Sequence, residues 1–386
     1  MTEHISNIHK ILKFLIKKKN VPLHEPFFDK KEISLLSSCI KSGYVSSVGK
    51  SIGIFEKKIS KLTKSKYCIA TVNGTSAIHI GLLALGLKKN EEILMPSLGF
   101  VAAPNAVSYC GGVPNFVDSE KKTLGIDPKK LDNYLKKISV KKYNNLVNKK
   151  TGRIIKGVIS IHLYGYASDV EGINNVCKKY NIFHLEDASE AIGSFYKNKH
   201  LGTFSDVGCL SFNGNKTITT GGGGMILTNK NSINNFARHV STTAKIKHSW
   251  ISSYDKIGYN YRMPNINAVL GIAQISKLNL ILKAKKKLHQ NYKRKLKNNK
   301  YFELYQENKF SKSNHWLNTI FIKKGDIKLR DKILSSLIKK NIYCRPTWKL
   351  LHKLVMYKNC PRDNLNQATE LEKKIITLPS SPNLII

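Results

Sequence analysis

The stretch that decides the fold is SFNGNKTITTGGGGM at residues 211–225, taken together with HLEDASEA at residues 184–191. Each stretch follows an apolar run typical of a buried strand, residues 207–212 before Lys216 and residues 182–185 before Asp187. A lysine just past a strand can form a Schiff base, and an acid at a neighbouring strand end can hold a protonated pyridine nitrogen. Pyridoxal phosphate (PLP) needs both groups, so the sequence predicts a PLP site.

Other segments add parts that such a site requires, and each also has a purely structural interpretation. The sequence NGTS at residues 73–76 ends a strand and opens a helix, where Thr75 or Ser76 is a candidate N-cap and the free N–H groups form a phosphate site. Phe100 follows a turn and can stack on a flat ring or simply fill the core. Asp187 can also cap the helix that follows it, and Glu186 is the adjacent alternative for the ring nitrogen.

Composition narrows the class of protein. The formal net charge is 65 − 25 = +40, but the basic residues are mostly lysines spread along the whole chain without a nucleic-acid-binding motif. The seven cysteines are scattered, with no CxxC, which predicts neither a disulfide framework nor a metal site and favours a reducing cytoplasm. The apolar run at residues 11–16 is interrupted by Lys13 and followed by three lysines, so we expect neither membrane insertion nor export.

Short strand-like runs alternate with helical patterns between residues 67 and 230, which predicts an α/β fold with a mostly parallel sheet. Residues 267–298 are helical throughout and suit a connector between domains. We therefore predict N-terminal helices or an arm over residues 1–45, a large cofactor-binding domain over 46–275, and a connector helix with a small domain over 276–386.

Six blocks of sequence, in this order along the chain, resemble the PLP-dependent nucleotide-sugar aminotransferases of the DegT/DnrJ/StrS family. They are NGTSAIHIGLLALG, PSLGFVAAPNAV, HLYGYASD, EDASEAIGS, SFNGNKTITTGGGG and GYNYRMPNINAVLGIAQ, and with their flanks they cover roughly residues 25–280. The resemblance implies the type I PLP-dependent transferase (aspartate aminotransferase-like) fold. In this fold a mostly parallel central sheet carries helices on both faces, and a smaller C-terminal α/β domain follows.

The resemblance also implies a role for each matching residue. Lys216 would hold PLP as an imine and then move a proton, Asp187 would bind the pyridine nitrogen, Phe100 would stack on the ring, and Glu190 would lie near its hydroxyl. Phosphate ligands would come from Gly74, Thr75, Ser211 and, across a homodimer with shared active sites, Asn260. The sugar side would be lined by His162 and Tyr164, and Arg262 would belong to the same interface segment as Asn260.

By the same resemblance, glutamate would donate its amino group through pyridoxamine phosphate to a nucleotide-linked keto-sugar. Gly222 and Gly223 stand where many relatives carry an acid. This departure, with the segments VPLHEPFF and RPTWKLLH, indicates C4 amination of a UDP-linked 4-keto-6-deoxy-N-acetyl sugar on a route to legionaminic acid or bacillosamine. The alternative is another keto-sugar, a 3-keto sugar or GDP-4-keto-6-deoxymannose for perosamine. A more distant alternative is a basic nucleic-acid-binding regulator on a PLP-like fold.

Overall fold

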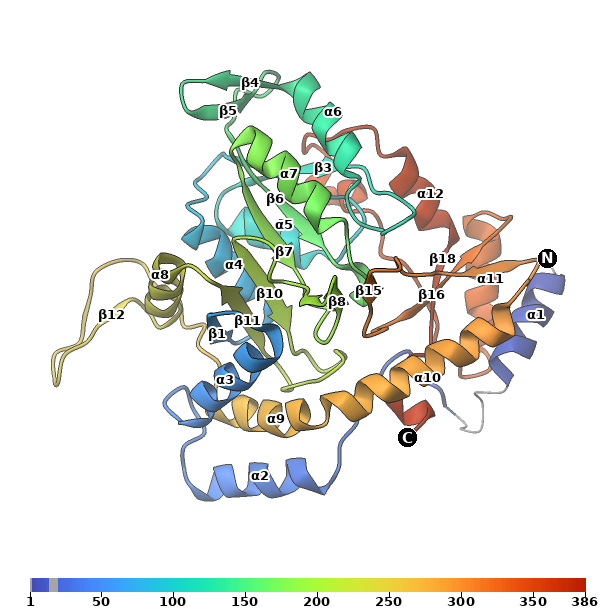
Figure 1. Cartoon of the computed structure of the whole chain (residues 1–386), viewed down its shortest axis with the longest axis horizontal. Coiled ribbons are helices and arrows are strands. Elements are labelled where there is room, and N and C mark those ends of the chain that lie inside the picture. The colour runs from blue at the N-terminus through green and yellow to red at the C-terminus, as the bar shows by residue number, and fades with distance from the viewer. Residues whose placement is uncertain (1, 14–19) are drawn as a thin grey trace.

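The computed structural model describes residues 2–13 and 20–386, and a seven-stranded sheet forms its centre (Figure 1). The strand order is β1-β11-β10-β7-β6-β2-β3. The strands are β1 (Tyr67–Thr71), β2 (Glu92–Pro96), β3 (Val113–Val117), β6 (Ile155–Ile161), β7 (Phe183–Asp187), β10 (Val207–Ser211) and β11 (Gly224–Thr228). Strand β11 runs antiparallel to both of its neighbours, and the pairings from β10 through β3 are parallel. The predicted mostly parallel sheet is therefore confirmed.

Helices cover both faces of this sheet because successive strand residues point to opposite sides. On one face, Ile69 packs with helices α4 (Gly74–Ala84), α5 (Ala102–Tyr109) and α8 (Asn231–Ser241). On the other face the neighbouring strand residues Cys68 and Ala70 pack under α3 (Ser51–Thr63) and α9 (Asn265–Ser276). Further along that second face lie α6 (Pro128–Ile138) and α7 (Val170–Tyr180). The sheet is thus the middle of three layers, as the alternating sequence pattern predicts.

A smaller unit is built around a four-stranded antiparallel sheet of order β14-β16-β18-β17. Its strands are β14 (Phe302–Leu304), β16 (Asn318–Ile322), β17 (Arg345–Pro346) and β18 (Ile375–Leu378). Helices α1 (Thr2–Lys13), α10 (Leu278–Leu296) and α11 (Ile327–Ile338) contribute to its core, to which the N-terminal residues Ile8 and Leu12 belong. The N-terminal helix and the C-terminal segment therefore share one hydrophobic cluster. The predicted N-terminal helices or arm over residues 1–45 include residues 1 and 14–19, which lie outside the described residues.

The prediction of one continuous helix over residues 267–298 is wrong. Helices α9 and α10 meet at an angle of 58°, with the break at Lys277. The Lys277 ammonium is buried there and lies 2.5 Å from Glu32 Oε1, at the start of α2 (Lys30–Lys41). The local sequence pattern around Lys277 does not predict this ion pair, because Glu32 belongs to a helix far away in the sequence. None of the described helices is long and apolar enough to cross a bilayer by itself; this bent pair meets the length and composition criteria only when both helices are taken together.

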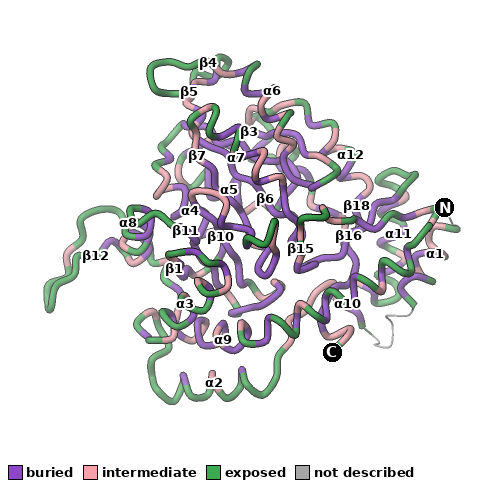
Figure 2. Tube along the Cα trace, viewed as in Figure 1, coloured by how far each residue is buried: buried purple, intermediate pink, exposed green. Residues whose placement is uncertain are grey.

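A projecting hairpin was not anticipated from the sequence. Strands β12 (Lys245–Ile246) and β13 (Ser253–Tyr254) extend away from the body of the protein, and Figure 2 shows most of this arm as exposed. Trp250 at its tip is 84% exposed. An aromatic side chain so far out of the core is unusual for an isolated chain and typical of a contact surface.

Candidate active site

Lys216 lies in the loop between β10 and β11, at the carboxyl end of the parallel strands, where ligands bind in open α/β sheets. A backbone turn holds the loop, in which the Lys216 N–H donates to the Asn213 carbonyl at 3.0 Å. The ammonium lies 3.4 Å from Glu190 Oε1 and 3.9 Å from the centre of the Trp316 ring. The amine is therefore held against one carboxylate and one aromatic face rather than extended into solvent.

Asp187 is the last residue of β7 and pairs in register with Cys209 of β10. Its carboxylate accepts a hydrogen bond from the Ser189 N–H at 3.1 Å. Burial raises the pKa of Asp187, against the opposing effects of the Ser189 bonds and of the nearby Lys216 charge. The raised pKa shows that the partners of Asp187 do not fully offset the cost of burying its charge. A nearby cation would stabilise this carboxylate, and a protonated pyridine nitrogen is such a cation.

Glu186 faces away from this site and is satisfied by the protein itself. It is completely buried and accepts four hydrogen bonds. The donors are His162 Nε2 at 3.0 Å and the backbone N–H groups of Gly202, Phe204 and Ser205 at 2.9, 2.7 and 2.8 Å. Burial by itself would raise its pKa, but the His162 bond and charge outweigh it and lower the pKa of Glu186 to about 2. The alternative that Glu186 binds the ring nitrogen is therefore excluded.

Glu190 connects the lysine to a strained turn. Its Oε2 accepts the backbone N–H of Tyr164 at 2.6 Å while Oε1 lies near Lys216. Tyr164 has a left-handed backbone (φ 58°), which is uncommon for an aromatic residue and here aims its N–H at the carboxylate. Burial raises the pKa of Glu190, and the Lys216 charge opposes this. Such a carboxyl group can give or take a proton close to the lysine amine.

The start of α4 lies close to Ser211 and forms a candidate phosphate cradle. Asn73, rather than Thr75 or Ser76, caps the helix, because its Oδ1 accepts the Ser76 N–H at 2.8 Å. A Cβ added at Gly74 would lie 2.9 Å from Ser211 Cβ and 3.3 Å from Ser189 Oγ. Only glycine therefore allows the first turn of α4, with its free N–H groups, to lie this close to the Ser211 hydroxyl.

Aromatic side chains form one wall of the site. Phe100 is 49% exposed, and its ring centre lies 5.8 Å from that of Trp348. Trp348 in turn stacks on Tyr164 at 5.5 Å with an interplanar angle of 20°. Tyr164 is buried, and its hydroxyl donates to Thr347 Oγ1 at 2.7 Å. The exposed ring of Phe100 is thus available for stacking, and Tyr164, although buried, is one of the residues that line the neighbouring cavity.

His162 requires a correction. The sequence places it on the sugar side, but the side chain has no exposed surface. Its Nε2 contacts Glu186, and its Nδ1 lies 3.2 Å from both the N–H and the hydroxyl of Ser168. With both ring nitrogens engaged inside the core, His162 positions Glu186 and does not line a cavity.

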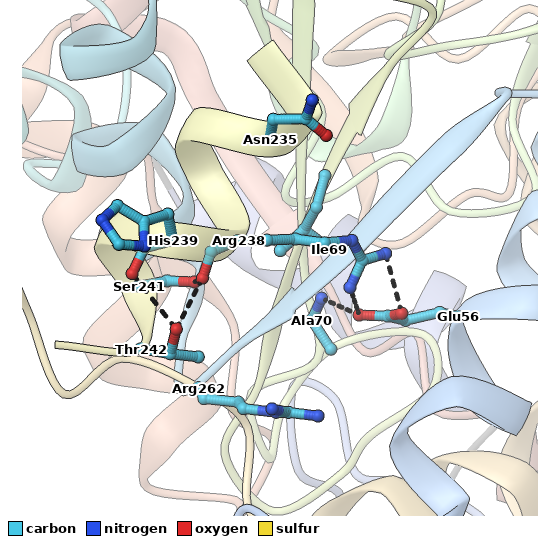
Figure 3. Close-up of a pocket in the computed structure, with 9 residues that line it drawn as sticks. All are labelled: Glu56, Ile69, Ala70, Asn235, Arg238, His239, Ser241, Thr242 and Arg262. Atoms are coloured by element: carbon cyan, nitrogen blue, oxygen red, sulfur yellow. Dashed lines mark hydrogen bonds and ion pairs between the residues drawn. The ribbon is translucent and has the colours of Figure 1, made fainter. Parts of the chain in front are cut away.

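Asn260 and Arg262 lie on the surface of the described chain. Both are exposed and are held by isolated bridges to Thr242 and Thr71 respectively. Arg262 lines a pocket of about 470 Å³ (Figure 3), where the Arg238 guanidinium pairs with Glu56 and the Arg262 guanidinium makes no bond to the other residues drawn. That Asn260 reaches the cofactor phosphate of a neighbouring subunit, and that Arg262 belongs to the same interface segment, stay predictions.

The tryptophans at 316 and 348 were not assigned a role from the sequence, although both adjoin the lysine or the aromatic wall. No local signal identifies them, because they come from the small unit, 100 and 132 residues from Lys216 along the chain. Within the described part of the chain, no group of three or more His, Cys, Asp or Glu side chains is placed to hold a metal ion.

Comparison with known proteins agrees with this geometry. A family model for the DegT/DnrJ/EryC1/StrS aminotransferases matches residues 26–385. The GDP-perosamine synthase of Escherichia coli O157:H7 is 34% identical over 368 residues, which cover 95% of this chain and 94% of that enzyme. The UDP-4-amino-4,6-dideoxy-N-acetyl-beta-L-altrosamine transaminase of Campylobacter jejuni is 28% identical, with coverage of 91% and 90%.

Among solved structures, the aminotransferase PseC of Helicobacter pylori superposes with a TM-score of 0.85, at 24% identity and 94% coverage of each chain. That likeness concerns the fold, which is thereby confirmed. Two GDP-perosamine synthases, at 34% and 32% identity, are more similar to this chain than the UDP-sugar transaminase is. The chain belongs to the DegT/DnrJ/EryC1/StrS family of PLP-dependent sugar aminotransferases.

Proposed function

We propose that this enzyme transfers an amino group from glutamate to C4 of a GDP-linked 4-keto-6-deoxy sugar, with GDP-4-keto-6-deoxymannose as the first candidate. The observation that carries the proposal is the juxtaposition of Lys216 with Glu190, at 3.4 Å, beside the buried Asp187. The similarity to a GDP-perosamine synthase over 95% of the chain supports the choice of sugar and of nucleotide.

Each residue of the site would have a separate role in holding the cofactor. When bound, PLP supplies the electron sink that stabilises negative charge on the carbon losing its proton. Asp187 would hold the ring nitrogen in its protonated form, and the cradle between Gly74 and Ser211 would hold the phosphate. Phe100 would cover one face of the ring.

Lys216 would act at the reacting carbon. It would first hold the cofactor and, once displaced, take the proton from the carbon that carries the amine. Glu190, at 3.4 Å, is the group that can balance the charge of the ammonium while it is protonated. The nearby Trp316 face excludes water from one side of the amine.

The test is a two-step assay with purified enzyme. Glutamate alone should bleach the visible band of the bound cofactor, and subsequent addition of the keto-sugar should restore it, with GDP-4-keto-6-deoxymannose compared against the UDP-linked sugar. Lys216→Ala should abolish both steps, while Lys230→Ala, which removes an exposed lysine paired with Asp206, should leave them intact. An unchanged band with every keto-sugar after glutamate would refute the assignment of the acceptor.

A UDP-linked 4-keto-6-deoxy-N-acetyl sugar is the second candidate. Its support is the 28% identity to a UDP-sugar transaminase and the missing acid after the lysine. At Gly222 an added Cβ would lie 3.6 Å from the nearest atom, the Val72 carbonyl oxygen, whereas at Gly223 it would lie 2.2 Å from Thr220 Oγ1. Position 222 therefore has room for the relatives' acid and position 223 does not. Gly222→Glu, assayed with both nucleotides, would show whether the missing acid contributes to the choice of sugar.

We propose further that the enzyme works as a homodimer in the cytoplasm. The exposed Asn260 and Arg262 and the projecting arm with Trp250 offer surfaces for a second copy. The cysteines are all unpaired, in keeping with a reducing compartment. Sedimentation of the purified protein would test the dimer, and a monomer that retains full turnover would contradict a shared site.

A further inference from the structure

A second cavity, of about 430 Å³, opens directly beside Lys216 toward the small unit. Two of its lining residues adjoin the lysine, since Asn215 precedes it in sequence and the Trp316 ring lies 3.9 Å from its ammonium. The polar groups around it include His24 and Arg345, and Trp348 closes another side. A ligand bound in this cavity would therefore lie close to the amine of Lys216.

Arg345 enters the cavity from a fixed backbone. It belongs to the short strand β17 and pairs in register with Thr377, whose hydroxyl also donates to the Arg345 carbonyl at 3.0 Å. Its guanidinium, by contrast, makes no hydrogen bond or ion pair with any residue in the described ranges 2–13 and 20–386. Apart from Arg262, the other arginines each have such a partner, as Arg238 has in Glu56 and Arg330 in Asp331. Arg345 is exposed as a residue, and its guanidinium offers the cavity five N–H donors that no described residue uses.

His24 approaches the same space from the N-terminal segment. Its neighbours in sequence are pinned to the small unit, because the Ser380 N–H donates to the Leu23 carbonyl at 2.7 Å and the Glu25 N–H donates to Ser381 Oγ at 3.0 Å. Both ring nitrogens are buried, and neither has a hydrogen-bond partner among the described residues. The nearby Asn215 carbonyl accepts the Trp316 indole N–H at 2.7 Å.

The ionisable groups in and around the cavity are mostly basic. Burial, followed by the charges of Lys285 and Lys216, lowers the pKa of His24 well below its ordinary value, so the ring is neutral and can donate one N–H. Lys285 is itself completely buried, and burial lowers its pKa well below the ordinary value; its amine donates to the carbonyls of Trp316 and Ser380 at 3.2 and 2.7 Å. The carboxylate closest to the lysine, Glu190, is already paired with it. A cavity with these groups favours an anion.

The position of the cavity indicates which anion. In an α-amino acid the carboxylate is attached to the carbon that bears the reacting amine, so it must lie next to Lys216. In a nucleotide sugar the diphosphate is separated from C4 by the width of the pyranose ring. A planar carboxylate also matches the fork of a guanidinium, which binds it through two parallel hydrogen bonds. The flat faces of Trp316 and Trp348 suit the methylene groups of the donor side chain.

We infer that this cavity is the amino-donor subsite, in which Arg345 binds the α-carboxylate of the donor and His24 donates a second hydrogen bond to it. The inference rests on the proposed function, because it presumes that an amino acid is the donor. It assigns specificity for the donor to two segments, at the N-terminus and in the small unit, that lie outside the strand ends carrying Lys216 and Asp187.

The test measures binding by calorimetry on the holoenzyme, with two probes titrated separately. The probes are 2-oxoglutarate, which has the carboxylates but no amine to react, and GDP alone. Arg345→Gln should raise the Kd of 2-oxoglutarate by at least tenfold and leave the Kd of GDP within twofold, and Arg345→Lys should recover part of the loss. His24→Phe should produce a smaller loss in the same direction. Arg294→Gln, the same change at an exposed arginine on α10, is the matched control.

The outcomes separate this inference from the proposed function. If glutamate fails to bleach the cofactor band of the wild-type enzyme, the proposed donor is wrong. If glutamate does bleach it and Arg345→Gln binds 2-oxoglutarate as tightly as the wild type, the inference alone is overturned. A loss confined to GDP, or an equal loss for both probes, also overturns it, because Arg345 would then serve the nucleotide diphosphate or a general electrostatic role.

Discussion

The neighbouring acids Glu186 and Asp187 should respond in opposite ways to loss of charge. Glu186 accepts four hydrogen bonds inside the core, whereas Asp187 accepts from Ser189 and faces the cofactor site. Glu186→Gln should therefore reduce the stability of the protein. Asp187→Asn should leave the stability of the cofactor-free protein unchanged or slightly higher, and should impair cofactor binding and turnover.

The magnitude follows from the pKa values. The pKa of Glu186 falls from 4.5 to about 2, and one pKa unit corresponds to about 1.4 kcal/mol, so its charge contributes about 3 kcal/mol at neutral pH. Because the folded pKa is the lower one, this contribution is present above about pH 4.5 and is lost as the pH falls toward 2. The pKa of Asp187 is raised by burial, so its charge costs stability in the absence of a cation.

Urea unfolding of the cofactor-free protein, followed by tryptophan fluorescence at pH 7, measures both effects. We expect Glu186→Gln to lose about 3 kcal/mol and Asp187→Asn to lose less than about 0.5 kcal/mol. With cofactor added, Asp187→Asn should lose several orders of magnitude in rate, while folded Glu186→Gln should retain the cofactor band. The reasoning is refuted if Asp187→Asn proves the less stable variant, or if Glu186→Gln keeps wild-type stability.

Three further changes test the phosphate cradle, the shared site and the surface charge. Gly74→Ala places a Cβ 2.9 Å from Ser211 Cβ, so the affinity for PLP, measured by dialysis, should fall at least tenfold. The control Gly53→Ala, whose added Cβ has no atom within 4 Å, should not change this affinity. Equal affinities of the two variants would contradict the phosphate cradle. Mixing Asn260→Ala with Lys216→Ala subunits should restore part of the activity, and no recovery after confirmed subunit exchange would argue against a shared site. Because the net charge is +40 and screening acts over about 8 Å at 0.15 M salt, kcat/KM for the nucleotide sugar should fall as ionic strength rises; a flat profile would exclude steering.

The central part of the site was predictable from the sequence because its signals are local. Lys216 and Asp187 each follow an apolar strand run, and both runs are strands of the parallel sheet, β10 and β7. The helix after NGTS begins at Gly74, where the free N–H groups were expected, although Asn73 is the cap. A strand end and a helix start depend on neighbouring residues, so a single sequence carries enough information to locate them.

Only the tertiary structure decided which side chains turn toward the site. Glu186 and Asp187 are equivalent in sequence, and they separate because adjacent strand residues face opposite sides of the sheet and the N–H groups of residues 202–205 are available on one side only. His162 was wrongly assigned to the sugar side for the same reason, since its partners Glu186 and Ser168 become neighbours only in the folded chain. The cavity residues His24, Trp316 and Arg345 come from opposite ends of the chain, and no local pattern encodes a contact over such a distance.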